Sequence, residues 1–160
     1  MTNPLKTILI FTLSIWCTLG LSLSQAAAQE PSTKNNVKMV LDIDTGIDDA
    51  MALAYAVGSP QVSLLGVVGS YGNVSLSQGL QNTLDLLTLL NKRHIPVYAG
   101  ASHTLNTQTV YEPDEQTKEF HGSNGIGEIK LTTSEAKIQQ ENGVDFYIDT
   151  YHRFSPALQG

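Results

Sequence analysis

The chain has almost no cysteine: Cys17, near the N-terminus, is the only one among 160 residues. Disulfide frameworks and thiolate-ligated metals are therefore excluded from the rest of the chain, where a metal site must use oxygen or imidazole ligands. Basic side chains are also scarce, with nine Lys and Arg against fifteen Asp and Glu. This balance argues against nucleic acid or an anionic membrane as a partner.

The N-terminus predicts a secretory signal peptide over residues 1–28. Lys6 supplies a basic start, Thr7 to Leu23 are largely apolar, and Ala26 to Ala28 form a small-residue cleavage site. The apolar part is short for a membrane span and no basic stop-transfer segment follows it, although a retained anchor is the alternative. We therefore expect a secreted or periplasmic protein with no stable membrane insertion after cleavage.

Residues 29–36 are polar and predict a flexible lead-in, and residues 37–160 predict one folded region. In that region, β-branched apolar runs alternate with helical patterns. The predicted strands are 37–41, 62–68 and 96–99, and the predicted helices are 50–57, 76–92 and 142–154. This order indicates an α/β fold with an open, mostly parallel sheet and helices on both faces.

Two details of this pattern can be tested by the structure. Residues 101–135 carry few periodic signals, which is long for a structureless connection and favours a functional loop. The last helix has an apolar face made of Val144, Tyr147, Ile148 and Tyr151.

Four aspartates follow the first predicted strand within eight residues: Asp42, Asp44, Asp48 and Asp49. Asp44 leaves the tip of the strand, Gly46 allows a tight turn, and Asp48 and Asp49 open a helix, where negative charge is favoured. One or two aspartates would indicate only a capped helix. Four carboxylates repel one another, and Ca²⁺, which takes six to eight oxygen ligands, is the simplest ion to neutralise them.

The segment Asp42-Ile-Asp44-Thr-Gly46-Ile-Asp48-Asp49-Ala resembles the N-terminal signature of the inosine-uridine-preferring nucleoside hydrolases, with threonine where proline is usual. Two more matches follow in the family's order. They are Gly72-Asn73 after the second strand and His121-Gly-Ser-Asn-Gly-Ile-Gly past the third. All three matches follow strands of a parallel sheet, so they fall at its carboxyl edge, where ligands bind in such folds.

The resemblance implies hydrolysis of the N-glycosidic bond of ribonucleosides at a Ca²⁺ that holds the attacking water and the ribose 2′- and 3′-hydroxyls. Carried over by position, Asp44 is the general base and a metal ligand, and Asp49 is the matching metal ligand. Asp48 and Asn73 bind ribose hydroxyls, and His121 lines the sugar or base side of the pocket. Asp42 is expected to orient these groups from behind the metal ligands.

Family members usually have a much longer chain, whose second half adds ligands to the metal and contacts to the leaving base. Residues 37–160 are therefore expected to be the N-terminal portion of such a domain, with little activity alone. Full-length homologues are expected to form homo-oligomers. Two alternatives stay open: a non-catalytic secreted remnant that binds calcium or ribose, and a haloacid-dehalogenase-type phosphatase. The phosphatase motif lacks a role for Asp48 and Asp49.

Overall fold

The computed structural model describes residues 36–155. The predicted signal peptide, and all but the last residue of the predicted lead-in, lie outside the described residues. Within this range, no helix combines the length and apolar character needed to cross a membrane.

The core of the fold is a three-stranded parallel sheet in the order β1-β2-β3. Its strands are β1 (Val37–Ile43), β2 (Val62–Gly69) and β3 (Val97–Ala99). All three runs are rich in valine or other apolar residues, which suits strands buried on both faces. The parallel pairing confirms the predicted fold class.

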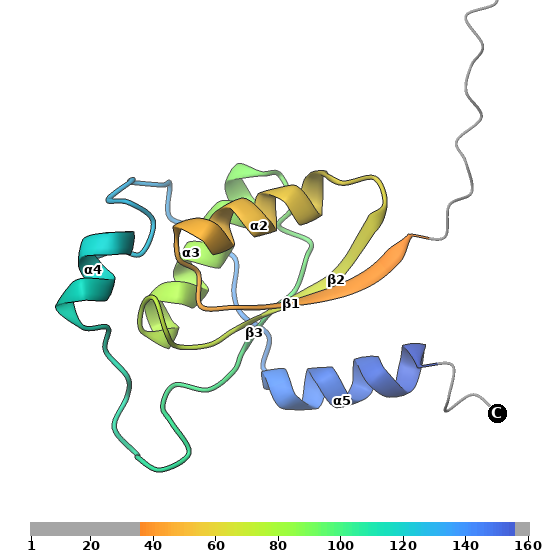
Figure 1. Cartoon of the computed structure of the whole chain (residues 1–160). Helices are drawn as coiled ribbons and strands as arrows, with labels where there is room; N and C mark the ends of the chain where they lie inside the picture. The colour runs from red at the N-terminus through yellow and green to blue at the C-terminus, as the bar shows by residue number, and fades with distance from the viewer. Residues whose placement is uncertain (1–35, 156–160) are drawn as a thin grey trace, which may run out of the picture. The chain divides into compact units, whose positions relative to one another are not determined.

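Helices cover both faces of this sheet. The crossover helices α2 (Ile47–Gly58) and α3 (Leu76–Leu89) lie on one face, and α5 (Gly143–Phe154) lies on the other (Figure 1). The alternation of side chains along a strand explains the two layers. Val67 packs into the core beneath α2 and α3, whereas Val68, the next residue, packs with Phe146 of α5.

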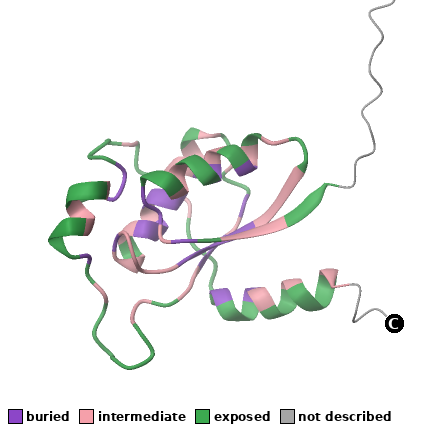
Figure 2. Ribbon diagram, viewed as in Figure 1, coloured by how far each residue is buried: buried purple, intermediate pink, exposed green. Residues whose placement is uncertain are grey.

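The larger core lies between the sheet and the two crossover helices, where buried residues run through the interior (Figure 2). Its most deeply buried side chains are Leu53, Val67, Leu87 and Val97, each at most 1% exposed. The smaller core beneath α5 is built on Tyr98 and Phe146, whose rings stack with centroids 3.9 Å apart. The two cores hold the carboxyl ends of the strands in fixed positions.

Two element predictions were wrong in detail. The second helix ends at Leu89 and not at Lys92, because Asn91 adopts a left-handed conformation with φ 58° that stops the helix. The segment 101–135, predicted to be a loop, contains the short helix α4 (Glu115–His121). Asp114 caps it by accepting a hydrogen bond from the Thr117 amide at 2.8 Å.

The apolar side chains predicted on one face of the last helix are mostly exposed, although Tyr147 packs against the smaller core. Val144, Ile148 and Tyr151 are 63%, 49% and 59% exposed, whereas Phe146 is buried. Gly143 lies against Val68 at the start of α5, and this close approach fixes the rotation of the helix. The residue three positions later, Phe146, then faces the sheet.

Candidate functional site

The first turn of α2 places two carboxylates beside the end of β1. We call residues 44–46, between β1 and α2, the aspartate turn. Gly46 precedes the helix, and its backbone N–H donates to Asp49 Oδ2 at 3.1 Å. Asp48 and Asp49 both lie in the first helical turn, as predicted, where the helix dipole favours negative charge.

Asn73 connects the carboxylates of Asp44 and Asp49. Its backbone N–H donates to Asp44 Oδ2 at 2.5 Å, and its side-chain Nδ2 donates to Asp49 Oδ2 at 3.4 Å. Gly72, just before it, must lack a side chain, because a Cβ there would overlap the Asp44 carboxylate. The loop after β2 therefore holds Asp44 in place through close backbone contact.

The Asp49 carboxyl is electrostatically unusual. Burial raises its pKa from 3.8 to about 6, and the neighbouring Asp44 and Asp48 carboxylates add to this rise. The Gly46 hydrogen bond acts in the opposite direction. A carboxyl that is partly buried beside other carboxylates is stabilised by positive charge, which either a proton or a bound cation can supply.

The pKa of Asp49 predicts how Asp49→Asn will change stability. Between about pH 4 and 6 the folded state binds more protons at Asp49 than the unfolded state, so the metal-free protein loses stability as pH rises through this window. Asparagine keeps an oxygen acceptor for the Gly46 amide but carries no charge. After discounting for solvent screening, we expect the variant to be more stable by about 1 kcal/mol above pH 7.

Denaturant titration of both proteins across pH, with a chelator present, measures this difference. The stability gain should shrink as the pH falls through 6 toward 4 and vanish only below 3.8, the ordinary pKa, where Asp49 is protonated in both states. Asp149→Asn, which removes an exposed charge on α5, is the matched control and should give no such pH-dependent gain. A difference that stays constant across pH would contradict the assignment.

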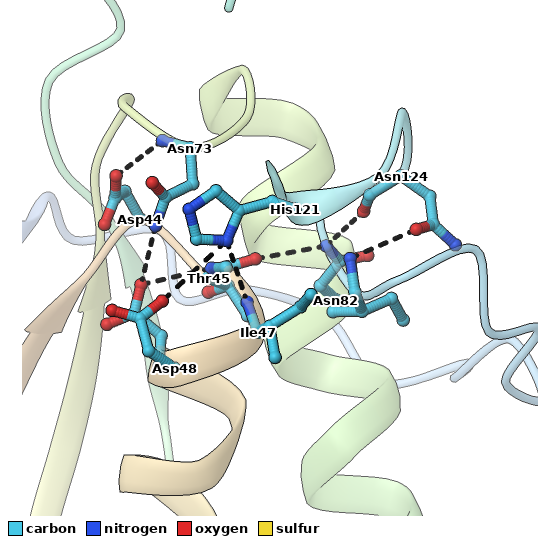
Figure 3. A network of polar contacts seen from close by, with 11 residues as sticks. Asp44, Thr45, Ile47, Asp48, Asn73, Asn82, His121 and Asn124 are labelled. Carbon is cyan, nitrogen blue, oxygen red and sulfur yellow. Dashed lines mark hydrogen bonds and ion pairs between the residues drawn. The ribbon is translucent and has the colours of Figure 1, made fainter. Parts of the chain in front are cut away.

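His121 reaches the same site from the end of α4. Its Nδ1 accepts a hydrogen bond from the Ile47 backbone N–H at 3.3 Å and lies 3.9 Å from Asp48 Oδ1 (Figure 3). The His121 side chain is 14% exposed and that of Asp48 is 71% exposed. These residues, with Met51 and Phe120, line an open cavity of about 310 Å³. Asp48 therefore presents a carboxylate that is free to meet a ligand.

Asp42 lies apart from this group. Asp42 is exposed and precedes Asp44 by two residues. It lies on the same face of β1 as Val40, which is the face that α5 covers. Burial raises the pKa of Tyr147 on α5, and the Asp42 carboxylate adds to that rise. The idea that Asp42 orients the metal ligands stays a prediction.

A buried polar network beneath the aspartate turn was not predicted. Thr45, which replaces the family's usual proline, is fully buried and shares a 2.8 Å hydrogen bond with the Thr83 hydroxyl. Its φ of 28° is one that proline, fixed near −65°, does not adopt. Asn82 donates to the Thr45 carbonyl and to the Asn124 carbonyl. The only sequence signal was a pair of polar residues, Asn82 and Thr83, on the otherwise apolar face of α3.

The carboxylates present fit a hard cation in part. Within residues 36–155, no three His, Asp or Glu side chains converge in a way that could hold a metal ion. Asp44, however, lies close enough to Asp49 to raise the Asp49 pKa, and both side chains have carboxylate oxygens of the type that Ca²⁺ prefers. Residues 36–155 therefore place two neighbouring carboxylates that could act as ligands, which is fewer than Ca²⁺ needs.

Comparisons with known proteins agree with this geometry. The family model described as inosine-uridine preferring nucleoside hydrolase matches residues 39–158. A purine-preferring ribonucleoside hydrolase from Gardnerella vaginalis superposes with a TM-score of 0.71 and 41% identity, over 74% of this chain and 37% of that one. The pyrimidine-specific ribonucleoside hydrolase RihA of Enterobacter sp. (strain 638) is 34% identical over 110 residues, which are 69% of this chain and 34% of that protein.

A third relative is short. An uncharacterised protein from Corynebacterium ammoniagenes is 50% identical over 95 residues, which are 98% of that protein and 59% of this chain. Against the two named hydrolases, in contrast, this chain spans little more than a third of their length. The family model nevertheless matches about three quarters of the chain and includes all the residues of the site. The chain belongs to the inosine-uridine preferring nucleoside hydrolase family.

Proposed function

We propose that this chain supplies the water-activating and ribose-binding part of a calcium-dependent nucleoside hydrolase, which converts a ribonucleoside and water to ribose and a free base. The observation that supports it most directly is the contact of one residue, Asn73, with both Asp44 and Asp49. This contact sets two carboxylates side by side at the carboxyl edge of the sheet. The family match makes ribonucleosides the expected substrates.

Each side chain has a role that its surroundings support. Asp44 accepts the proton of the attacking water, and its second task is to bind the cation together with Asp49. Bound Ca²⁺ would supply positive charge that makes a water more acidic and draws in the ribose hydroxyls. Asn73 keeps the two carboxylates at a fixed separation.

Asp48 and His121 complete the sugar side of the proposed site. The exposed Asp48 carboxylate accepts hydrogen bonds from the ribose hydroxyls, and His121 borders the cavity beside it. The base preference stays open, because one relative is named purine-preferring and another pyrimidine-specific. We also propose that the protein is exported, since residues 1–28 have the composition of a signal peptide.

Calorimetric titration with Ca²⁺ tests the metal assignment. A full-length protein that contains this portion should bind Ca²⁺, and Asp44→Ala and Asp49→Ala in it should each weaken binding at least about tenfold, because each removes a charged ligand. Asp149→Ala changes the net charge equally but lies on exposed α5, so its affinity should match the wild type. Equal affinity in all four proteins would remove Asp44 and Asp49 from the proposed site.

A reducing-sugar assay then separates catalysis from binding alone. A full-length protein that contains this portion should release ribose from inosine or uridine in a Ca²⁺-dependent manner. Calcium binding without ribose release would favour the alternative of a non-catalytic remnant. No observation favours the phosphatase alternative, because the family match extends over residues 39–158.

A further inference from the structure

The polar network beneath the aspartate turn has one branch point, Asn82 of α3. We propose that Asn82 is a positioning residue: it fixes the aspartate turn against residues 121–127, which we call the His121 loop. This inference rests on the proposed function, because it assigns Asn82 to the placement of the carboxylates and of His121. Asn82 itself touches no group that we assign to substrate or metal.

The Asn82 amide makes use of all its polar atoms. The side chain is 3% exposed, so no bulk water competes for it. Its Nδ2 donates to the Asn124 carbonyl at 2.8 Å and to the Thr45 carbonyl at 3.4 Å. Its Oδ1 accepts from Gln78 Nε2 at 2.8 Å, one helical turn earlier, which fixes the orientation of the amide.

The two carbonyls belong to segments that are far apart in the sequence. Thr45 is the central residue of the aspartate turn, and Asn124 is in the middle of the His121 loop. The planar amide of asparagine has two N–H donors, so it can satisfy both carbonyls from a single position. A buried aspartate would face them with acceptor oxygens, and leucine or alanine would leave both carbonyls without this donor.

The His121 loop is attached to the start of α2 at a second point, so the contribution of Asn82 must be distinguished from that of His121. At its start, His121 Nδ1 accepts from the Ile47 amide at 3.3 Å. The Asn124 side chain accepts from the Ile126 amide within the loop and from the Glu128 amide just after it, and it donates to the Ile129 carbonyl, so the loop is rigid. Asn82 therefore holds a preformed loop at its centre, whereas the His121 contact holds only the first residue of the loop.

Hydrogen exchange on the purified chain tests this role. Asn82→Ala should speed exchange at least about tenfold at the amides of Gly46 and Ile47 in the aspartate turn and the adjoining helix start, and of Ile126 and Gly127 in the loop. Amides of the sheet should change only as far as global stability does. If the wild type binds Ca²⁺, the variant should also bind it about tenfold more weakly, because its ligands are less well ordered.

Thr88→Val is the matched control. Thr88 is also on α3, and its hydroxyl donates to Ser134 Oγ at 2.7 Å, which ties the helix to a loop outside the site. This variant should leave exchange at Gly46 and Ile126 at the wild-type rate. If Asn82→Ala fails to fold, Gln78→Ala keeps Asn82 but removes the bond that orients it, and it should loosen the same amides to a smaller degree.

Two results would overturn the role of Asn82. One is unchanged exchange in both segments of Asn82→Ala. The other is a uniform rise in exchange over the whole sheet, which is the behaviour of a residue that serves global stability alone. Failure of the wild type to bind Ca²⁺ would instead count against the metal site, and the exchange measurement would still decide the role of Asn82.

Discussion

In a full-length relative with the same signature, replacing the residue that matches Asp44 with asparagine is expected to lower kcat by roughly 10²–10⁴. Asparagine is nearly isosteric and can still accept a hydrogen bond from the amide that matches Asn73 N, so the fold should persist. It cannot take a proton from water, and it removes one charge from the metal site. Steady-state kinetics at saturating Ca²⁺ would measure this loss.

A second variant separates the position of the carboxylate from its chemistry. In the same full-length relative, replacing the glycine that matches Gly72 with alanine keeps the aspartate but places a methyl group where its carboxylate lies, so the carboxylate must move. The expected result is a large loss of kcat with a small change in melting temperature. Gly58→Ala is the matched control, because a Cβ at Gly58 meets open space. Full activity in the Gly72→Ala and Asp44→Asn proteins would rule out the proposed base.

Replacing the residue that matches Asp48 with asparagine is expected to lower kcat/KM by roughly 10- to 100-fold, the range for hydrogen bonds to a charged group. The effect should fall on both KM and kcat, because the ribose hydroxyls are held in the ground state and in the transition state. Wild-type enzyme should cleave 2′-deoxyribonucleosides poorly for the same reason. Kinetics with matched ribose and deoxyribose substrates would measure both effects.

Wild type and variant, each measured with a ribonucleoside and with its 2′-deoxyribonucleoside, form a double-mutant cycle. If Asp48 contacts the 2′-hydroxyl, the variant and the deoxy substrate remove the same interaction, so their losses should not add. The residue that matches Asp145, an exposed acid on the opposite helix α5, provides a control substitution with the same charge change. Losses that add fully would assign Asp48 to some other part of the site.

The sequence by itself determined the elements and the edge at which the site forms. Valine-rich runs and helical patterns alternate along the chain, and parallel strands bring their carboxyl ends together. Asp44 and Asn73, which follow neighbouring strands, therefore had to meet at one edge, whereas His121 reaches that edge from the end of α4. Asp48 and Asp49 could be placed at a helix start because that preference is local.

Other features were decided only by tertiary contacts. The rotation of α5, which buries Phe146 and exposes Ile148, follows from the approach of Gly143 to Val68, which no local pattern encodes. Thr45 and Thr83 are 38 residues apart, and Asn82 and Asn124 are 42 apart. Hydrogen bonds across such separations depend on how whole elements pack, because each side chain alone is compatible with several partners.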